Sequence, residues 1–558
     1  MENRYWHQYY PKGMPTDIDL TKYSSLTELL VLSCIKFRNQ NAFVNMGQFL
    51  TYDDVLRLSE QFAAYLQNHT DLKPGDRIAI QMPNLLQYPV VLLGALRAGL
   101  IVVNTNPLYT PREMEHQFKD SGAKAIVILE NFASHLDKIV ANTDIKHVIT
   151  TGVGDFIDGL KGKFINFAVR KIKKMVPEYH LPTAKTLPEV MEWGSDSTFT
   201  PVPQKLDDVA FLQYTGGTTG VSKGAMLTHG NLVANLLQIE AWKASAILPG
   251  QERIFTALPL YHIFALTVNC LVFMHVGALN ILVTNARDLD SVMKAIKQYE
   301  PTFMTGVNTL FNALLNRPDF ADLDFSKLKV AAAGGMAVQS DVVNRWKSTT
   351  GSLLMEGYGL TEASPVTHFN PMDGRDRIGS IGFPMPGTDV KIVNDAEEEV
   401  PFGEAGELCI KGPQVMAGYW NRPDETAKTI KNGWLHTGDI GVAFPDGFFK
   451  IVDRKKDMIL VSGFNVYPNE IEEVISAHPK VKEVCAIGVP DEHSGEAVKV
   501  FIVRNGNVSV AELESYCKEN FTGYKRPKYY EFRDELPKSN VGKLLRRPLR
   551  EEELQKRK

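Results

Sequence analysis

The chain has 558 residues, more than one compact hydrophobic core usually organises, so two or more domains are expected. Its 44% hydrophobic and 23% charged residues are typical of folded enzymes and exclude a disordered or fibrous protein. A formal net charge of -4 argues against a nucleic-acid-binding protein, which normally carries excess positive charge. Phosphorylated small molecules are not excluded, because helix N-termini and local cations can hold them.

Five dispersed cysteines without a CxxC pair indicate a reducing compartment, and neither a disulfide framework nor a zinc site. The N-terminus has no apolar segment after a basic start, so no secretory signal is expected. The longest apolar run, residues 263–283, contains Asn269 and Asn280 and is predicted to form a buried helix, a turn at Gly277 and a strand over Leu279–Thr284. We therefore expect a soluble, cytoplasmic protein.

In chain order, roughly the first 430 residues alternate short β-branched runs with amphipathic helical patterns. Strands are predicted over Arg77–Gln81, Ile101–Asn104, Lys124–Leu129, Lys146–Thr150, Val209–Tyr214, Arg253–Pro259, Phe303–Val307 and Lys329–Ala333. Helices are predicted between them, for example over Tyr52–Gln67 and Pro111–Asp120. Strands separated by helices of this size form βα units with largely parallel sheets.

The sequence pattern changes after residues 453–457, Asp-Arg-Lys-Lys-Asp. Beyond them we predict a short segment, two helices and two strands, over Met458–Tyr467, Pro468–Ala477, Val510–Asn520, Val481–Gly488 and Val498–Arg504. The expected α/β protein has a large N-terminal domain of βα-built sheets (1–452), a hinge (453–457) and a small mobile α+β domain (458–558). A charged run of this kind is also typical of a solvated loop, and composition does not distinguish the two.

The strongest motif is Tyr-Thr-Gly-Gly-Thr-Thr-Gly-Val-Ser-Lys-Gly over residues 214–224, between a predicted strand and a helix opening near Thr228. Glycines let the backbone approach a polyphosphate, hydroxyl and N–H groups supply donors, and Lys223 adds a positive charge. The spacing does not fit a Walker A motif. The alternative, a Gly/Thr-rich surface turn, explains neither the hydroxyl groups nor the lysine.

This loop resembles the phosphate-binding loop of the adenylate-forming enzymes, the superfamily of acyl-CoA synthetases, beetle luciferases and peptide-synthetase adenylation domains. Residues 356–362, Glu-Gly-Tyr-Gly-Leu-Thr-Glu, resemble the family segment that borders adenine, contacts the α-phosphate and holds Mg²⁺. A carboxylate suits that position because Mg²⁺ prefers hard oxygen ligands. The resemblance implies catalytic roles for Thr215, Thr361 and Glu362, and Mg²⁺ binding by Glu362 and Thr218. It also implies contacts to ATP by eleven residues of the two segments: Thr215, Gly216, Gly217, Thr218, Thr219, Gly220, Lys223, Glu356, Gly357, Tyr358 and Gly359.

Three later positions complete the nucleotide site that the resemblance implies, and a fourth marks the hinge. Asp439 lies in a stretch, 432–456, that is similar to the signature of fatty acyl-CoA synthetases, and would bind both ribose hydroxyls. Arg454 would also contact the nucleotide, and Asp453 matches the family's hinge residue. Lys543 ends the motif Pro-Lys-Ser-Asn-Val-Gly-Lys and would bridge the substrate carboxylate and the α-phosphate. Without the motif, Lys543 would be one lysine in a basic tail.

The residues predicted for the acyl and CoA sites rest more heavily on the family resemblance than those of the nucleotide site. His262, in Pro-Leu-Tyr-His-Ile-Phe-Ala-Leu, falls where the family places an aromatic or imidazole group beside the acyl and pantetheine channel; a packed core histidine is the alternative. Gly334 and Gly335 would line the acyl pocket. CoA would be contacted by Ser462, Gly463, Phe464 and Lys525, although Gly463 also fits a simple turn.

Over nearly its whole length the sequence resembles bacterial long-chain fatty acid–CoA ligases. That family converts ATP and a fatty acid to acyl-AMP and pyrophosphate, then forms acyl-CoA and AMP with CoA, feeding fatty acid β-oxidation; it also implies a homodimer. One alternative is an adenylate-forming enzyme with a different acid (medium-chain or aromatic) or a different acceptor. Another is a catalytically silent fatty-acid binding or transport protein.

Residues 161–176 mix bulky apolar side chains with clustered positive charge. Such a composition suits a helix lying on anionic lipid, here the inner face of the cytoplasmic membrane, where free fatty acids partition. A solvated surface helix is the alternative interpretation.

Overall fold

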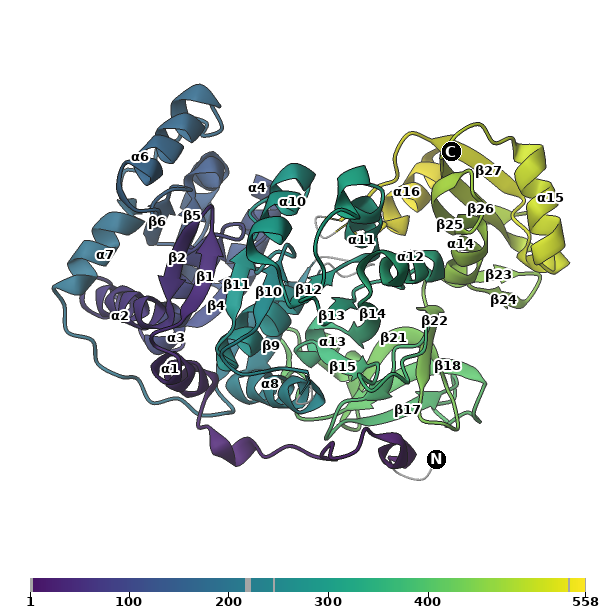
Figure 1. Ribbon diagram of the computed structural model, residues 1–558, viewed down its shortest axis with the longest axis horizontal. Coiled ribbons are helices and arrows are strands. Elements are labelled where there is room, and N and C mark those ends of the chain that lie inside the picture. Colours follow the sequence, from purple (N-terminus) through teal and green to yellow (C-terminus); the bar gives the residue numbers. More distant parts are fainter. Residues whose placement is uncertain (1–3, 216–221, 244–245, 540–541, 557–558) are drawn as a thin grey trace.

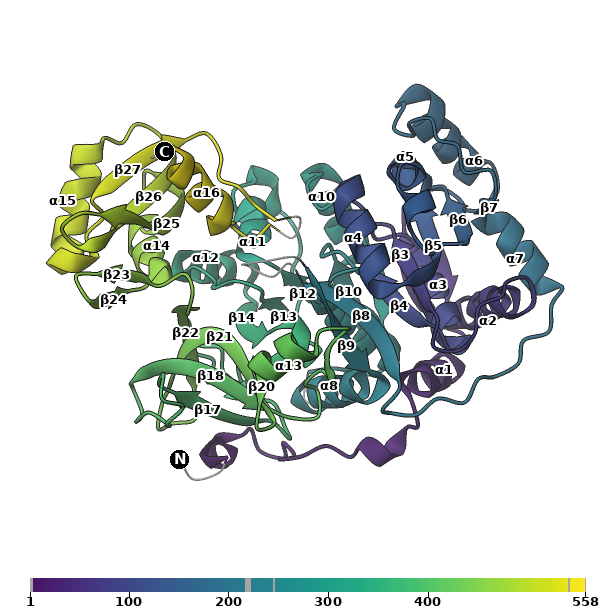
Figure 2. The same ribbon diagram turned by 180° about the vertical axis from the view of Figure 1, so that it is seen from behind.

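The computed structural model describes residues 4–215, 222–243, 246–539 and 542–556. In these ranges the chain forms four β-sheets. Figures 1 and 2 show a large unit, which carries the first three sheets, and a smaller unit at one end, which follows β22 (Phe449–Arg454). The mixed α/β class, with a large N-terminal part and a smaller C-terminal part, is confirmed.

An eight-stranded sheet has the order β19-β9-β8-β4-β3-β5-β6-β7. The pairs from β8 to β7 are parallel, as predicted, whereas β9 and β19 are antiparallel additions. Its strands are β3 (Arg77–Gln81), β4 (Ile101–Asn104), β5 (Ala123–Leu129), β6 (His147–Thr151), β7 (Lys185–Thr186), β8 (Val209–Thr215), β9 (Lys223–Thr228) and β19 (Gly418–Tyr419). The helices in this stretch of chain are α2 (Tyr52–Asn68), α3 (Gln87–Arg97), α4 (Pro111–Ser121), α5 (Ala133–Asp137), α6 (Gly159–Phe167) and α7 (Leu187–Ser195).

A nine-stranded sheet has the order β16-β15-β14-β13-β12-β10-β11-β1-β2 and is parallel from β14 to β1. Its strands are β1 (Asn41–Asn45), β2 (Gln48–Thr51), β10 (Arg253–Thr256), β11 (Leu279–Leu282), β12 (Phe303–Gly306), β13 (Val330–Ala333), β14 (Leu353–Gly359), β15 (Val366–Phe369) and β16 (Phe383–Pro384). The accompanying helices are α1 (Leu26–Lys36), α8 (His229–Lys243), α9 (Phe273–His275), α10 (Leu289–Tyr299), α11 (Asn308–Leu315) and α12 (Ser340–Thr350).

The long apolar run 263–283 folds as the sequence predicts. It forms a fully buried π-helix, Ala265–Val272, followed by α9, a left-handed turn at Gly277 and strand β11. Its polar residue Asn269 donates to Phe255 O (3.2 Å) and Thr256 Oγ1 (3.1 Å), so the amide is satisfied inside the core. Among the described residues, no helix combines the length and the apolar character needed to cross a bilayer.

A third sheet, of five strands, is antiparallel throughout, with β22 pairing on β21. It consists of β17 (Asp389–Val393), β18 (Ala405–Lys411), β20 (Ile430–Lys431), β21 (Trp434–Ala443) and β22, with the short helix α13 (Pro423–Thr429). The prediction of βα units with largely parallel sheets up to about residue 430 is therefore wrong for this region, because connections without crossover helices join neighbouring antiparallel strands.

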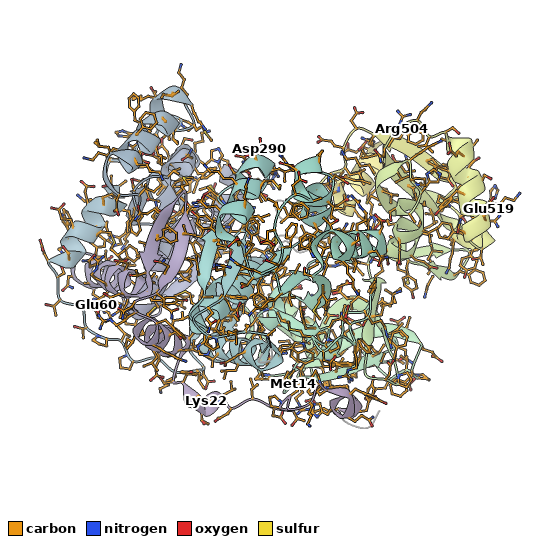
Figure 3. All side chains as sticks on the ribbon, viewed as in Figure 1. Met14, Lys22, Glu60, Asp290, Arg504 and Glu519 are labelled. Carbon is orange, nitrogen blue, oxygen red and sulfur yellow. The ribbon has the colours of Figure 1, made fainter. Side chains whose placement is uncertain are left out.

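The C-terminal unit has a sheet with the order β24-β23-β26-β25, to which β27 adds in parallel on β26. Its elements are β23 (Ile459–Val461), β24 (Phe464–Val466), α14 (Pro468–Ser476), β25 (Val481–Asp491), β26 (Gly495–Arg504), α15 (Val510–Asn520), β27 (Tyr529–Arg533) and α16 (Arg546–Lys556). Residues such as Ile459, Ile471, Val500 and Phe521 pack into a hydrophobic cluster of its own. The charged side chains labelled in Figure 3, for example Glu60, Asp290, Arg504 and Glu519, lie on the outside.

Candidate active site

The described ends of the predicted phosphate-binding segment belong to two antiparallel strands, and not to a strand followed directly by a helix. Thr215 ends β8, Lys223 begins β9, and the two residues are register partners in an antiparallel ladder. The helix expected near Thr228 does begin next to it, at His229, but strand β9 was missed. The candidate residues Gly216, Gly217, Thr218, Thr219 and Gly220 lie outside the described residues.

Lys223 is tied to two side chains that sequence reasoning missed. Its Nζ lies 2.6 Å from Glu425 Oε2 and 4.9 Å from the ring centroid of Tyr419. The hydrogen bond to Lys223 lowers the pKa of Glu425 to about 2. Tyr419 Oη in turn donates to Glu362 Oε1 (2.7 Å), and burial together with this carboxylate raises the Tyr419 pKa. The hairpin lysine and the carboxylate of the 356–362 segment therefore belong to one network.

Glu362 has the chemistry of a Mg²⁺ ligand. It sits in the 3₁₀ turn Thr361–Ala363 directly after β14, and Tyr419 occupies only one of its carboxylate oxygens. In the part of the chain that the structure describes, Oε2 accepts no hydrogen bond. Because Mg²⁺ prefers one or two carboxylates together with phosphate oxygens, this single half-free carboxylate fits the ion.

A second network joins β14 to the antiparallel sheet. Tyr358 Oη donates to Asp439 Oδ2 (2.6 Å), and Arg454 Nε lies 3.3 Å from Asp439 Oδ1. Asp439 and Arg454 face each other as partners of the β21–β22 ladder. Burial and the neighbouring carboxylate raise the pKa of Tyr358, so its hydroxyl remains a donor.

A cavity of about 290 Å³ borders this second network. Its lining residues are Thr437, Gly438, Arg454, Lys455 and Lys456. Burial lowers the pKa of Lys456 to about 8. Hydroxyl and cationic groups around an open cavity, next to the carboxylate of Asp439, are suited to a polar anionic ligand such as a nucleotide.

Lys543 reaches this region from the C-terminal unit. The preceding carbonyl, Gly542 O, accepts from Thr309 Oγ1 of α11 (3.3 Å), so the loop rests against the large unit. Burial and the positive charge of Arg454 lower the pKa of Lys543 to about 8, while Asp439 opposes the shift. Burial and the charge of Lys543 lower the pKa of His262 to about 4, so the imidazole is neutral at pH 7.

The glycines of the 356–362 segment are explained by close packing against a phenylalanine ring and against backbone. A Cβ on Gly357 would lie 2.5 Å from Phe369 Cδ2, and one on Gly359 would lie 2.2 Å from Pro365 O. Glu356 O accepts from Asn370 Nδ2 (2.9 Å), and burial raises the pKa of the Glu356 carboxyl to about 8. These residues shape the end of β14 whether or not they touch a ligand.

The two candidate acyl-site glycines follow β13. A Cβ on Gly334 would lie 3.2 Å from the Phe264 ring, and Gly335 has a φ of 80°, which favours glycine. Phe264 N donates to His262 Nδ1 (3.3 Å). His262 and Gly334 therefore share Phe264 as a neighbour, which places the candidate acyl residues close together.

The four CoA candidates lie on a different side of the C-terminal unit. Ser462 and Gly463 form the β23–β24 turn with φ of 50° and 85°, so the turn alone accounts for the glycine. Phe464 stacks on Tyr524 at 4.7 Å, and Lys525 Nζ pairs with Glu470 Oε1 (2.6 Å). Figures 1 and 2 both show β23 and β24 away from α11, so these residues are not brought to Lys543 in this conformation.

Asp453 connects the two units. It lies in β22 opposite Ile440, and its fully buried carboxylate accepts from the backbone N–H groups of Arg454 (2.7 Å) and of Asn469 (2.7 Å) in the first turn of α14. Arg546, in α16, contacts the same carboxylate at 3.5 Å. Arg546 is another residue that sequence reasoning missed.

Residues 33–420 match the family of AMP-binding enzymes, and residues 470–543 match the AMP-binding enzyme C-terminal domain. The chain belongs to this family of adenylate-forming enzymes.

Within the family, the chain is 56% identical over 548 residues, 98% of each chain, to a long-chain-fatty-acid–CoA ligase of Escherichia coli O6:H1. It is 38% identical, over 98% of each chain, to a long-chain-fatty-acid–CoA ligase of Bacillus subtilis strain 168. Among solved structures, an anthranilate CoA ligase in complex with anthranoyl-AMP has a TM-score of 0.86 and 25% identity, covering 97% of this chain and 100% of that chain. ATP-bound MatB from Rhodopseudomonas palustris has a TM-score of 0.81 and 27% identity, covering 94% and 98%.

Proposed function

We propose that this protein is a long-chain fatty acid–CoA ligase, which activates a fatty acid as acyl-AMP and transfers the acyl group to CoA, feeding β-oxidation. The observation that carries the proposal is the position of Lys543. This lysine comes from the C-terminal unit and lies within electrostatic range of Arg454, Asp439 and His262. A nucleotide and a carboxylate would meet there. Full-length relatives with more than half of their residues identical support the choice of substrate.

In the first half-reaction, an oxygen of the fatty acid attacks the α-phosphorus of ATP and pyrophosphate leaves. Lys223 and Thr215 hold the β- and γ-phosphates, Thr361 contacts the α-phosphate, and Asp439 with Arg454 holds the ribose. Lys543 neutralises the charge that the carboxylate and phosphoryl oxygens share in the transition state. Glu362, together with Thr218, would hold Mg²⁺, which when bound neutralises phosphate charge.

In the second half-reaction, the CoA thiol attacks the acyl carbon and AMP leaves. We propose that the C-terminal unit, residues 458–558, rotates about the 453–457 hinge, withdraws Lys543 and presents Ser462, Gly463 and Phe464 to CoA. The Asp453 carboxylate caps α14 from the last strand of the large unit, which is the place where a change in backbone angles would reorient the unit. Lys525 reaches a CoA phosphate only after leaving Glu470.

The acyl chain would pass His262 and the two glycines, Gly334 and Gly335, that follow β13. A neutral His262 beside Lys543 adds no positive charge to the carboxylate site, so orientation of the carboxylate is left to the lysine. We further propose that the enzyme acts as a homodimer in the cytoplasm and meets its fatty acid at the inner face of the membrane.

The test is a coupled assay with ATP, Mg²⁺, CoA and carboxylic acids that differ in chain length. The proposal predicts equal amounts of AMP, pyrophosphate and acyl-CoA, with the highest kcat/KM for long chains. A preference for a medium-chain or aromatic acid would instead identify an adenylate-forming enzyme with a different substrate. Absence of pyrophosphate with every acid would identify a silent binding or transport protein and overturn the proposal.

A further inference from the structure

A helical segment projects from the outer end of the large unit. It consists of α6 and the π-helical turn Ala168–Ile172 that continues it, and it follows the strand β6 near the edge of the eight-stranded sheet. Figures 1 and 2 both show α6 at the end of the molecule opposite the C-terminal unit.

The face of α6 that packs on the protein is small and polar. A Cβ on Gly162 would lie 2.1 Å from Ile157 O and 2.4 Å from Gly154 O, so no side chain fits there. Asn166 Oδ1 accepts from Gly154 N (2.7 Å), and its Nδ2 donates to Asp155 Oδ1 (2.8 Å). These contacts fix the rotation of the helix about its own axis.

The opposite face exposes large apolar side chains. Leu160 is 84% exposed, Phe164 63% and Phe167 54%, and their i, i+4, i+7 spacing places them in one stripe. Ile172 and Met175 extend the exposed apolar surface beyond the helix. An ordinary surface helix has the reverse arrangement, with its apolar stripe toward the core. A contiguous exposed patch of this kind marks an interaction surface.

Positive charge surrounds the stripe. The segment from 159 to 177 contains six cations, Lys161, Lys163, Arg170, Lys171, Lys173 and Lys174, and no carboxylate. Since the whole chain has a net charge of -4, this concentration is local. Arg170 is paired with the buried Glu130 (2.7 Å) and anchors the far end of the segment.

We propose that this segment, which we call the α6 projection (residues 159–175), binds the surface of an anionic lipid bilayer. The apolar stripe enters the boundary between headgroups and acyl chains, and the surrounding cations contact anionic headgroups. A purely apolar partner surface would not explain the cations, and a purely acidic partner would not explain three exposed apolar side chains in register. The purpose of the contact rests on the proposed function, because long-chain fatty acids partition into bilayers. Because the α6 projection lies opposite the C-terminal unit, that unit would remain free to move while the protein is bound to the membrane.

The experiment measures sedimentation of the full-length protein with vesicles of phosphatidylcholine alone or with added phosphatidylglycerol. A charge variant carries Lys163→Gln, Lys171→Gln and Lys174→Gln; Lys173 is kept because it lies within electrostatic range of Asp288. A stripe variant carries Leu160→Ser, Phe164→Ser and Phe167→Ser. Matched controls, on exposed residues elsewhere, are Lys294→Gln with Lys297→Gln and Lys347→Gln, and Leu32→Ser with Ile35→Ser and Leu248→Ser.

The charge variant is expected to bind anionic vesicles about 100-fold more weakly, because each cation near such a surface contributes about fivefold. The stripe variant is expected to lose at least about tenfold for both vesicle types. The controls should bind like the unaltered protein. Vesicle binding that neither variant weakens would overturn the proposal, as would a stripe variant that keeps vesicle binding but changes oligomeric state in light scattering, since the stripe would then join two copies of the chain.

Ligase activity is measured in parallel with a water-soluble short-chain acid, without vesicles. Both variants should retain it, because no residue of the α6 projection belongs to the candidate active site. A protein that binds vesicles through the projection but forms no acyl-CoA would refute the proposed function and leave the lipid surface intact. A protein that forms acyl-CoA but does not bind vesicles would refute the lipid surface and leave the proposed function intact.

Discussion

Arg546 offers the sharpest test of how the C-terminal unit is held at the hinge. Its Nη2 lies 2.8 Å from Glu472 Oε2 and 2.7 Å from Asn469 Oδ1, and its Nη1 lies 3.5 Å from Asp453 Oδ1 and 3.4 Å from Asp457 Oδ2. One guanidinium that is only 14% exposed therefore compensates carboxylates from β22, the hinge and α14. Lys543 lies three residues earlier in the chain, so these contacts anchor the chain directly after this lysine.

Arg546→Met leaves Glu472 and Asp453 without their cation, whereas Asp457 keeps Arg550 at 2.7 Å. Removing one partner of a buried ion pair costs about 3–5 kcal/mol. Burial already raises the pKa of Glu472 and of Asp453, and loss of the arginine raises both further. The folded variant then binds more protons than the unfolded one, so its stability increases as the pH falls.

Hydrogen exchange of backbone amides in α14 and α16 is the assay. At about pH 7.5 the Arg546→Met protein should open at least about 100-fold more often than the unaltered protein, and the difference should shrink at about pH 5.5. The matched control is Arg547→Met, which removes a 59% exposed arginine paired with Glu551 and should cost less than about 0.5 kcal/mol. Equal effects of the two substitutions, or a deficit that does not depend on pH, would show that Arg546 does not stabilise these buried carboxylates.

Three further predictions concern the nucleotide and acyl sites. Lys543→Ala should slow acyl-adenylate formation about 100- to 1000-fold and spare thioester formation from supplied acyl-AMP; equal loss of both half-reactions would contradict its assignment. Because the cationic form of Lys543 is the active one, kcat/KM for pyrophosphate exchange should fall as the pH rises through about 8, and the Lys543→Arg protein should lack that fall. Tyr358→Phe removes the hydrogen bond to Asp439 and should raise KM for ATP about tenfold with little change in kcat; an unchanged KM would exclude this positioning role.

Much of the fold follows from local patterns in the sequence. The helix Val510–Asn520 has its predicted bounds because Ser509 caps its N-terminus, its side chain accepting from Glu512 N. The start predicted for the helix at Tyr52 coincides with the capping box of Thr51 and Asp54. Local signals of this kind require only neighbouring residues, which a single sequence contains.

The features that could not be predicted from the sequence depend on residues that lie far apart in the chain. Lys223 and Glu425 are 202 residues apart, and no spacing rule connects them. Strand β9 was overlooked because its only apolar residues are the three consecutive ones over 225–227, a run too short to indicate a strand. Helix α16 was not predicted, and only the folded unit brings its Arg546 to the carboxylates of Asp453, Asp457 and Glu472.

In the proposed reaction, a carboxylate oxygen becomes bonded to the α-phosphorus of ATP before CoA takes the acyl group. The most direct measurement uses a long-chain fatty acid labelled with oxygen-18 in its carboxylate and mass spectrometry of the nucleotide product. When the thiol attacks the acyl carbon of acyl-AMP, the C–O bond to the phosphate breaks and that oxygen leaves with AMP. We expect AMP that carries a single labelled oxygen in each turnover. Unlabelled AMP, or label appearing in inorganic phosphate beside ADP, would exclude an acyl-adenylate intermediate.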